Sequence, residues 1–395
     1  MIRTVEGTIM DATPLYDLSP IFRLMLLGCI VAAGPLAWIW LRNRQASVVR
    51  RLQALTIVTL FLTFDLVLFG AFTRLTDSGL GCPDWPGCYG AASPMGARHD
   101  IHAAQTAMPT GPVTFSKAWV EMIHRYLATG LGVLIVVLTV VSWMERRRLR
   151  ISPWWPTFTL FWVCLQGALG ALTVTLKLFP AIVTLHLLGG MVLLALLRAQ
   201  ALRYAQADPV APQVPVVLPA RIRWAIGLVF ALLSCQIVLG GWVSTNYAVL
   251  ACTDFPTCQG SWWPVMNFHE GFYLWRELGE DRSGASIPFD ALTAIHYVHR
   301  LTAYAVFVAL GWLAWHLWRL PALRNTARWI VALALWQLLT GVSNVLFDWP
   351  LLAAVSHTGG AAGLVLVLTG ALLVTRSAMP ARQGIAHPPV SPLSP

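Results

Sequence analysis

Charged residues are scarce in this sequence. They make up 11% of its 395 residues, whereas hydrophobic residues make up 57%. A soluble globular domain usually carries about 25% charged residues, so this scarcity excludes an ordinary soluble enzyme. Apolar runs of about 20 residues recur along the chain, and each can cross the roughly 30 Å hydrocarbon core of a bilayer as a helix. The sequence therefore predicts an all-α integral membrane protein, because helices satisfy their own backbone hydrogen bonds in lipid.

Long basic segments are also absent. The formal net charge is +10, which in a soluble protein would raise the question of nucleic-acid binding. The basic residues fall instead in short runs between apolar segments, without interleaved aromatic residues. Nucleic-acid binding is therefore not expected.

Nine apolar segments are long enough to span the membrane. They lie near residues 21–41, 52–72, 118–143, 155–176, 181–201, 222–245, 291–315, 328–346 and 351–375. Arginines concentrate in four connections, 42–51, 144–154, 202–221 and 316–327. These connections share one side if the helices alternate, and the positive-inside rule makes that side cytoplasmic. The long loops 73–117 and 246–290 then lie outside, and the proline-rich end of the chain is expected to be a disordered cytoplasmic tail.

The chain contains an internal repeat. GCPDWPGC at residues 81–88 recurs as ACTDFPTC at residues 251–258. At nearly the same separation along the chain, EMIHRYLA recurs as HYVHRLTA, LQGALG as WQLLTG and HLLGG as HTGG. Self-similarity at nearly one offset indicates a duplicated unit. We therefore expect two tandem four-helix bundle halves related by pseudo-two-fold symmetry, preceded by one extra N-terminal transmembrane helix.

The repeat predicts a division of the chain into five parts. The N-terminal tail with the extra helix takes residues 1–51, the first half 52–203, a cytoplasmic linker 204–221, the second half 222–376 and the tail 377–395. The first apolar run has no basic residues before it in the manner of a signal peptide and no obvious small-residue cleavage site. It is expected to be a retained helix.

Four histidines are selected by the repeat: His124, His186, His299 and His357. Each lies near the start of a predicted helix that enters from the outer side, at a depth of roughly 8–12 Å. Ionisable residues inside membranes are costly and usually functional, and facing histidines in a helix bundle are typical of metal or haem sites. Zinc would require more ligands. Interhelical hydrogen bonding is the simpler explanation for any single histidine, but not for two equivalent pairs.

Neighbouring residues are further candidates for these sites. Arg125 and Arg300 each follow a histidine and can pair with a haem propionate or extend to lipid headgroups. Two glycine pairs lie shortly after His186 and His357: Gly189 with Gly190, and Gly359 with Gly360. They would either admit a flat macrocycle or allow close helix packing.

The two halves differ at one position beside the histidines. Glu121 lies three residues before His124, whereas His296 occupies the matching position before His299. On this helix face a carboxylate can act as a general base or hold a water; otherwise it is a residue near a helix start that favours the dipole. An enzyme that reacts at one haem and passes electrons through the other explains the difference. We expect His299 rather than His296 to be the ligand, because only His299 is followed by arginine.

The predicted outer location favours two disulfides, Cys82–Cys88 and Cys252–Cys258, because disulfides persist in oxidising compartments. The C-x5-C spacing is a poor match to zinc sites. Closing so short a loop contributes only about 2–2.5 kcal/mol in the chain-entropy treatment. We therefore expect each loop to be a rigid lid over a haem pocket, with a redox role for Cys82–Cys88 as the alternative. The remaining cysteines are expected to be inert core residues: Cys29, Cys164 and Cys235.

The sequence resembles the haem A synthase family over residues 52–375. The matching pieces are FGAFTRLTDSGLGCPDWPGC, the E-x-x-H-R of Glu121 to Arg125, LQGALGALTV followed by TLHLLGG, ACTDFPTC, the VHR of residues 298–300 and SHTGGAAG. The resemblance implies an oxidoreductase that converts a ring methyl of haem O to a formyl group, making haem A for cytochrome oxidase. The extra helix at 21–41 departs from the usual eight-helix pattern of the family.

The same resemblance implies roles for the candidate residues. His124 and His186 would be the axial ligands of the substrate haem O, His299 and His357 those of a haem b cofactor, and Glu121 the catalytic residue. Haem O synthase and cytochrome oxidase assembly factors are candidate partners, while the electron acceptor is not indicated. The implied location is the inner membrane of a bacterium, with the cysteine loops and haem sites toward the periplasm and the C-terminus in the cytoplasm.

Two other functions stay open at the level of the sequence. A di-haem, quinol-linked electron-transfer protein of the cytochrome b type would explain the histidine pairs but neither Glu121 nor the cysteine loops. A transporter would explain the repeat. The repeats run parallel, however, and no broken helix is evident near the midplane.

Overall fold

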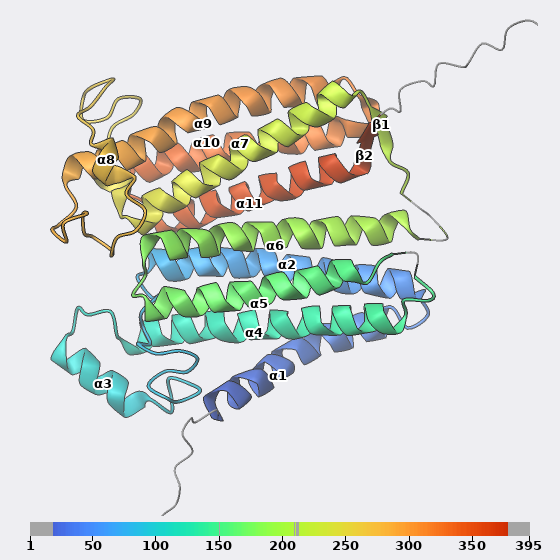
Figure 1. Ribbon diagram of the computed structural model, residues 1–395, viewed down its shortest axis with the longest axis horizontal. Helices are drawn as coiled ribbons and strands as arrows, with labels where there is room; N and C mark the ends of the chain where they lie inside the picture. The colour runs from blue at the N-terminus through green and yellow to red at the C-terminus, as the bar shows by residue number, and fades with distance from the viewer. Residues whose placement is uncertain (1–18, 150, 209, 211–212, 378–395) are drawn as a thin grey trace, which may run out of the picture.

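The computed structural model describes residues 19–149, 151–208, 210 and 213–377. Nine of the described helices are long and apolar enough to cross a membrane. They are α1 (Ser19–Arg42), α2 (Val48–Leu75), α4 (Phe115–Met144), α5 (Trp154–Thr175), α6 (Pro180–Gln206), α7 (Ala220–Thr245), α9 (Phe289–Trp318), α10 (Arg324–Leu346) and α11 (Leu351–Val374). The predicted all-α membrane fold with nine spans is confirmed (Figure 1). The two ends of the chain, 1–18 and 378–395, for which the sequence predicts tails, lie outside the described residues.

Several short elements gather at the two ends of the bundle. Figure 1 shows α3 (Arg98–Ala107), α8 (Phe268–Gly271) and the long loops at one end, called here the cysteine-loop end. The 3-10 helix η1 (Ala248–Ala251) precedes the second cysteine loop, and η2 (Pro321–Leu323) precedes α10. At the opposite end, called the strand end, β1 (Val216–Leu218) pairs in parallel with β2 (Thr375–Ser377). The sequence did not predict this ladder, because three-residue runs carry no periodic signal.

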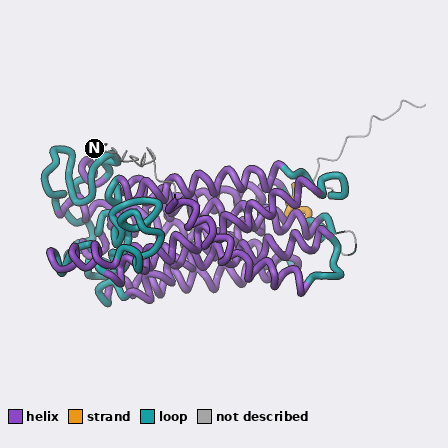
Figure 2. The backbone as a smooth tube through the Cα atoms, turned by 90° about the horizontal axis from the view of Figure 1, so that it is seen from below, coloured by secondary structure: helices purple, strands orange, loops and turns teal. Residues whose placement is uncertain are grey.

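The helices extend beyond the apolar runs that predicted them. α4 begins at Phe115, and the Thr114 hydroxyl accepts the Lys117 N–H at 3.3 Å. α2 begins at Val48, where the Ser47 hydroxyl accepts the Arg50 N–H at 3.3 Å. Polar caps of this kind satisfy the free amides of a first turn. Hydropathy alone therefore places the helix starts too late. Figure 2 shows the resulting long helices, with the loops confined to the two ends.

The helices pack as two groups of four. α2, α4, α5 and α6 contact one another in the first half, and α7, α9, α10 and α11 do so in the second. α6 packs on α7 and α11, and α2 packs on α11, so these helices join the halves. At this junction a Cβ on Gly359 would lie 2.9 Å from Leu68 Cδ2. The division of the chain at residues 52, 204, 222 and 377 stays a prediction.

The extra helix α1 lies against α4 and α2, outside both groups of four (Figure 1). Glycines allow a close approach: a Cβ on Gly28 would lie 2.5 Å from Thr129 Cγ2, and one on Gly130 would lie 2.7 Å from Val31 Cγ1. Small residues at such crossings let membrane helices pack backbone to backbone. α1 thus packs tightly against the first half.

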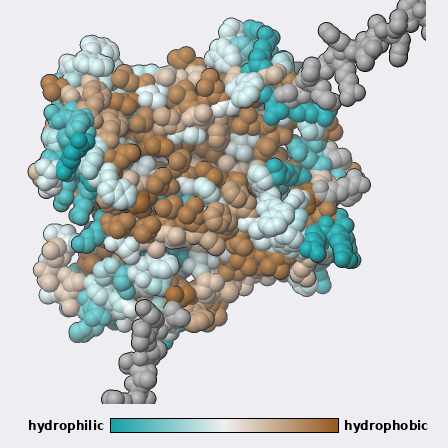
Figure 3. Space-filling view, in the orientation of Figure 1, coloured by the Kyte–Doolittle hydropathy of each residue, from teal (hydrophilic) through white to brown (hydrophobic). Residues whose placement is uncertain are grey.

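The surface matches a bilayer environment. Figure 3 shows hydrophobic residues across the middle of this face and hydrophilic residues toward both ends. One sequence expectation is wrong here: Cys29, Cys164 and Cys235 are exposed on the helix surfaces rather than buried in the core. In a lipid-facing position a thiol is tolerated because it behaves as a small apolar group.

Candidate functional site

One continuous cavity contains all four predicted histidines. Its volume is about 600 Å³, and its walls include His124, His186, His299, His357 and Glu121. The histidines lie within the first three turns of α4, α6, α9 and α11, which corresponds to roughly 9–15 Å along each helix. These helices all start at the cysteine-loop end (Figure 1). The structure therefore brings the two pairs together at a similar depth.

Each histidine packs against a glycine of a neighbouring helix in its own half. A Cβ added to Gly70 would lie 3.1 Å from His124 Nε2, and one added to Gly170 would lie 3.3 Å from His186 Cε1. In the second half the corresponding distances are 2.9 Å from Gly240 to His299 Cε1 and 3.2 Å from Gly341 to His357 Cε1. A larger side chain at any of the four glycines would displace the imidazole. The repeat pairs Gly70 with Gly240 and Gly170 with Gly341, a signal that the sequence analysis did not use.

The donor set fits a haem in each half. The first half supplies two imidazoles to the cavity, and the second supplies three because His296 also lines it. No group of three or more histidine, cysteine or acidic side chains suited to a metal ion occurs among the described residues. A haem iron needs only two axial ligands, because the macrocycle supplies the other four. His186 Nδ1 is buried without a hydrogen-bond partner among the described residues.

Hydrogen bonds hold the histidines of the second half. The Thr340 hydroxyl lies 2.8 Å from His357 Nδ1 and donates to the Trp336 carbonyl at 2.7 Å. It therefore accepts the Nδ1–H, which leaves Nε2 of His357 as the ligand atom. The Gln236 amide nitrogen lies 3.0 Å from His299 Nδ1 and 3.4 Å from its Nε2.

The first half has no equivalent of these two contacts. In the register set by the paired glycines, the residues at the positions of Gln236 and Thr340 are Leu66 and Leu169. The histidines of the two halves therefore differ in how firmly their rings are oriented. Gln236 and Thr340 were not predicted from the sequence, although both are polar residues in predominantly apolar helices.

Glu121 is buried, with 4% of its surface exposed, and both of its oxygens are engaged. Oε2 accepts the Cys82 N–H at 2.8 Å, and Oε1 pairs with the Arg125 guanidinium. A buried carboxylate is costly unless it is paired and hydrogen-bonded in this way. Glu121 also lines the cavity that holds His124.

His296 replaces Glu121 in the second half. Its Nδ1 lies 3.1 Å from the Ala248 carbonyl, and its Nε2 accepts the Arg300 Nε–H at 3.2 Å. Both ring nitrogens are therefore occupied. His296 is thus a hydrogen-bonding partner of Arg300, and the choice of His299 as the ligand stays a prediction.

Arg125 and Arg300 each hold a cysteine loop. Arg125 Nη1 donates to the carbonyls of Asp84, Pro86 and Gly87 at 2.9, 3.2 and 2.5 Å. Arg300 donates to the carbonyls of Cys252, Asp254 and Thr257 at 2.9, 2.8 and 2.9 Å. Both arginines also line the cavity. Their pairing with haem propionates stays a prediction, and the contacts with the loops are a second role.

The structure joins Cys82 to Cys88 and Cys252 to Cys258. Trp85 and Pro86 of the first loop and Phe255 of the second line the cavity. Each loop therefore covers one side of the site, which is the lid position expected from the sequence.

An aspartate closes each loop from inside. Asp84 accepts the N–H groups of Tyr89 and Gly90 at 2.6 and 2.7 Å, and Asp254 accepts those of Gln259 and Gly260 at 2.7 and 3.0 Å. The Thr257 hydroxyl and these backbone amides stabilise the charged carboxylate, and they lower the pKa of Asp254 below its ordinary value.

The glycine pairs named from the sequence serve mainly in helix packing. A Cβ on Gly189 would lie 1.9 Å from Gln166 Nε2, and one on Gly360 would lie 2.6 Å from Gln337 Nε2. Gly359 packs against Leu68 across the halves, and only Gly190 lines the cavity. Of the two explanations left open, close packing is the one that the contacts favour.

Comparison with known proteins identifies the family of the chain. Residues 53–369 match the COX15-CtaA family, described as cytochrome oxidase assembly protein. The chain is 39% identical over 312 residues to a haem A synthase of Shewanella oneidensis, covering 79% of this chain and 92% of that relative. It is 25% identical to one of Halalkalibacterium halodurans over 74% of this chain and 86% of the relative, and 27% identical to one of Neorickettsia sennetsu over 76% and 91%. The chain therefore belongs to the haem A synthase family of cytochrome oxidase assembly proteins.

Proposed function

We propose that this protein oxidises the ring methyl group of haem O to a formyl group and so makes haem A. The observation that carries the proposal is the single carboxylate of Glu121, which faces the cavity beside one histidine pair and has no counterpart beside the other. The curated relatives are named haem A synthases, and the chain matches them over most of their length, which supports the same activity.

The first half is the substrate site in this proposal, with His124 and His186 as the axial ligands of haem O. The second half holds haem b through His299 and His357. The hydrogen bond that Thr340 accepts from His357 suits a resident cofactor, because outer partners fix the orientation of ligating imidazoles. Leu66 and Leu169 at the equivalent positions form no such bond with the histidines of the first half. A haem bound there would exchange more easily, as a substrate has to.

The reaction is a stepwise oxidation of one carbon. Two successive hydroxylations turn the methyl group into a gem-diol, which loses water to give the formyl group. Each hydroxylation replaces one C–H bond by a C–O bond to oxygen from water and releases two protons and two electrons, so an external electron acceptor has to take up four electrons in total. Haem b, when bound, supplies a redox centre through which electrons can leave the substrate site.

The residues of the chain handle protons and position. Glu121 takes a proton from the water or hydroxyl that adds oxygen to the substrate carbon, which is general-base work. Arg125 and the Cys82 N–H hold the carboxylate in place for this step. Trp85 and Pro86 cover the site and limit the access of bulk water.

The orientation follows from the charges of the loops. The cysteine-loop end faces the periplasm of a bacterial inner membrane, and the strand end faces the cytoplasm. Arg50 in the first arginine-rich region pairs with Asp208 at 2.8 Å at the strand end. Haem O synthase and cytochrome oxidase assembly factors are the proposed partners on the pathway from haem O to the oxidase.

Extracted haems from cells with and without the gene test the proposal. Deletion is expected to abolish haem A and to accumulate haem O, and the wild-type gene should restore haem A. A protein that only transfers electrons between two haems would leave haem A formation intact. Normal haem A in the deletion strain would contradict the proposal.

A further inference from the structure

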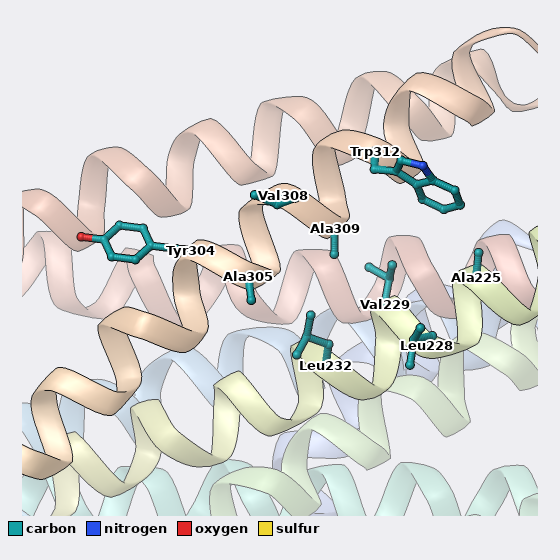
Figure 4. Close-up of a pocket in the computed structure, with 9 residues that line it drawn as sticks. All are labelled: Ala225, Leu228, Val229, Leu232, Tyr304, Ala305, Val308, Ala309 and Trp312. Atoms are coloured by element: carbon teal, nitrogen blue, oxygen red, sulfur yellow. The ribbon is translucent and has the colours of Figure 1, made fainter.

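A groove runs along the membrane-facing surface between α7 and α9, apart from the cavity of the four histidines (Figure 4). It encloses about 590 Å³. Leu228 and Leu232 of α7 and Ala305, Val308 and Ala309 of α9 form much of its wall, so the groove is apolar. In Figure 4 the side chains of Leu232 on α7 and Ala305 on α9 point into the space between the two helices, and Tyr304 and Trp312 lie toward opposite ends of the labelled residues.

The repeat identifies the same groove in the first half, where α1 fills it. Six residues of the α7–α9 groove have apolar counterparts on α2 and α4, in the register that pairs Gly70 with Gly240 and His124 with His299. These counterparts are Leu55, Val58, Leu62, Val133, Leu134 and Val137, and all of them pack in one apolar cluster with Ala32, Leu36 and Ile39 of α1. The groove between α2 and α4 is thus a helix-binding groove.

Exposure marks the difference between the two grooves. Leu228 is 72% exposed and Val308 is 75% exposed. Their counterparts, Val58 and Val133, are only partly exposed where α1 packs on them. No described segment of the chain occupies the second groove as α1 occupies the first.

We propose that the groove between α7 and α9 docks one apolar transmembrane helix of another membrane protein. The occupant of the equivalent groove is such a helix, and helix association in lipid depends on close van der Waals packing rather than on an apolar surface alone. Ala305 and Ala309 provide the small residues against which larger side chains of the incoming helix fit.

The α1 helix of a second copy does not fit this groove. Gly28 of α1 already has no room for a Cβ, which would lie 2.5 Å from Thr129 Cγ2. Tyr304 stands at the position that corresponds to Thr129, and Trp312 at that of Val137. Their rings would take the space of the α1 backbone. The partner helix therefore carries small residues opposite Tyr304 and Trp312 and is not a copy of α1.

Tyr304 connects the groove to the cofactor half. It lines both the groove and the four-histidine cavity, and it lies five residues after His299. Its hydroxyl makes no hydrogen bond with a described residue of the chain, so a carbonyl or hydroxyl of a docked helix can accept one. Docking at this groove would thus reach the wall of the proposed haem b site.

Site-specific photocrosslinking in living cells tests the docking. A photoreactive phenylalanine derivative at Val308 is expected to join the chain to one different polypeptide and to give a defined adduct mass. The same derivative at Val133 should react within the chain, with α1. At Leu339, which is 66% exposed on α10, it should give no protein adduct.

A groove-filling variant makes the result specific. Ala305→Trp should lower the yield of the Val308 adduct at least tenfold, whereas Leu339→Trp should not. If Ala305→Trp fails to accumulate, Leu228→Trp changes the opposite wall and decides the question. Adducts with lipid alone, an adduct of twice the mass of the chain, or an adduct that survives groove filling would each overturn the proposal. The readout needs no haem A formation, so it is independent of the proposed function.

Discussion

The carboxylate of Glu121 is fixed at two points before any substrate binds. Its oxygens contact the Cys82 N–H and the Arg125 guanidinium, and Arg125 in turn holds three carbonyls of the first cysteine loop. A side chain held in this way loses little conformational entropy when it acts, which is the advantage of a preorganised site. The position of this residue therefore depends on the loop as well as on α4.

Glu121→Gln should keep bound haem and lose product. The amide has nearly the same shape and can still accept the Cys82 N–H, but it cannot take up a proton. We expect haem A formation to fall by about 10²–10⁴-fold, the range of a general base. Glu145→Gln is the control, since Glu145 follows the other end of α4 and pairs with Arg148 at 3.3 Å. Unchanged haem A yield in Glu121→Gln would remove the residue from the mechanism.

Thr340→Val should weaken haem b binding. The variant keeps the size of the side chain but removes the oxygen that accepts the His357 Nδ1–H. Loss of such an outer partner typically costs about 10–100-fold in metal affinity. The measurement is the transfer of haem from the purified protein to excess apomyoglobin. Thr302→Val, which removes only a bond to the helix carbonyl of Val298, should transfer haem at the wild-type rate; equal effects of both variants would contradict the assignment.

At the scale of elements, the two cysteine loops share one design. Each is closed by a disulfide and contains an aspartate that accepts hydrogen bonds from two backbone amides of the loop. An arginine of α4 or α9 donates hydrogen bonds to the carbonyls of each loop. Gly90 and Gly260 have a φ of +70°, which a residue with a side chain rarely adopts. The loops differ in what lies beneath them: Glu121 in the first half and His296 in the second.

Removal of each disulfide should therefore have a different result. The Cys82→Ala/Cys88→Ala variant should reduce haem A formation while haem b stays bound, because the Cys82 N–H holds Glu121. The Cys252→Ala/Cys258→Ala variant should instead loosen haem b, because Arg300 binds the Cys252 carbonyl. Each deletion is expected to cost about 2–2.5 kcal/mol of stability. Product yield and haem content, measured together, check this, and identical profiles of the two variants would refute it.

Acid should open the second loop before it affects the helices. The pKa of Asp254 is lowered from its ordinary value of 3.8, so its bonds stabilise the loop above about pH 4 and are lost as the pH falls through the lower, folded-state pKa. Hydrogen-exchange protection factors of the Gln259 and Gly260 amides should be constant from pH 7 to 5 and fall below about pH 4. Asp254→Ala, which removes both acceptor oxygens, should show low protection throughout this range. If protection of these amides in the wild type did not depend on pH, the hydrogen bonds of Asp254 would not be what stabilises the loop.

Much of this arrangement could be predicted from the sequence because it depends on local composition. Apolar runs predicted the nine helices, and the repeat selected the histidines, Glu121 and the cysteine pairs. Gln236, Thr340 and the four glycines at the histidines were missed, because their roles arise from contacts between helices. The exposure of Cys235 and the pairing of β1 with β2 likewise depend on packing, which hydropathy does not encode.

At the scale of the whole molecule, the two groups of four helices differ at three places. One half has Glu121 and an added helix α1, and the other has polar partners for its histidines. The halves remain tied at the cysteine-loop end, where Arg74 donates to the Ser244 carbonyl at 2.7 Å and the Tyr247 hydroxyl donates to Asp77 at 2.6 Å. A shared cavity and such ties are what a substrate site coupled to a cofactor site requires.

The absorption spectrum of purified histidine variants tests the central claim that the two halves hold different haems. His357→Ala and His299→Ala should each lose the low-spin haem b signal, while His186→Ala should retain it and fail to make haem A. Retention of the signal in His357→Ala and His299→Ala, together with its loss in His186→Ala, would contradict the account and reverse the assignment of the two halves.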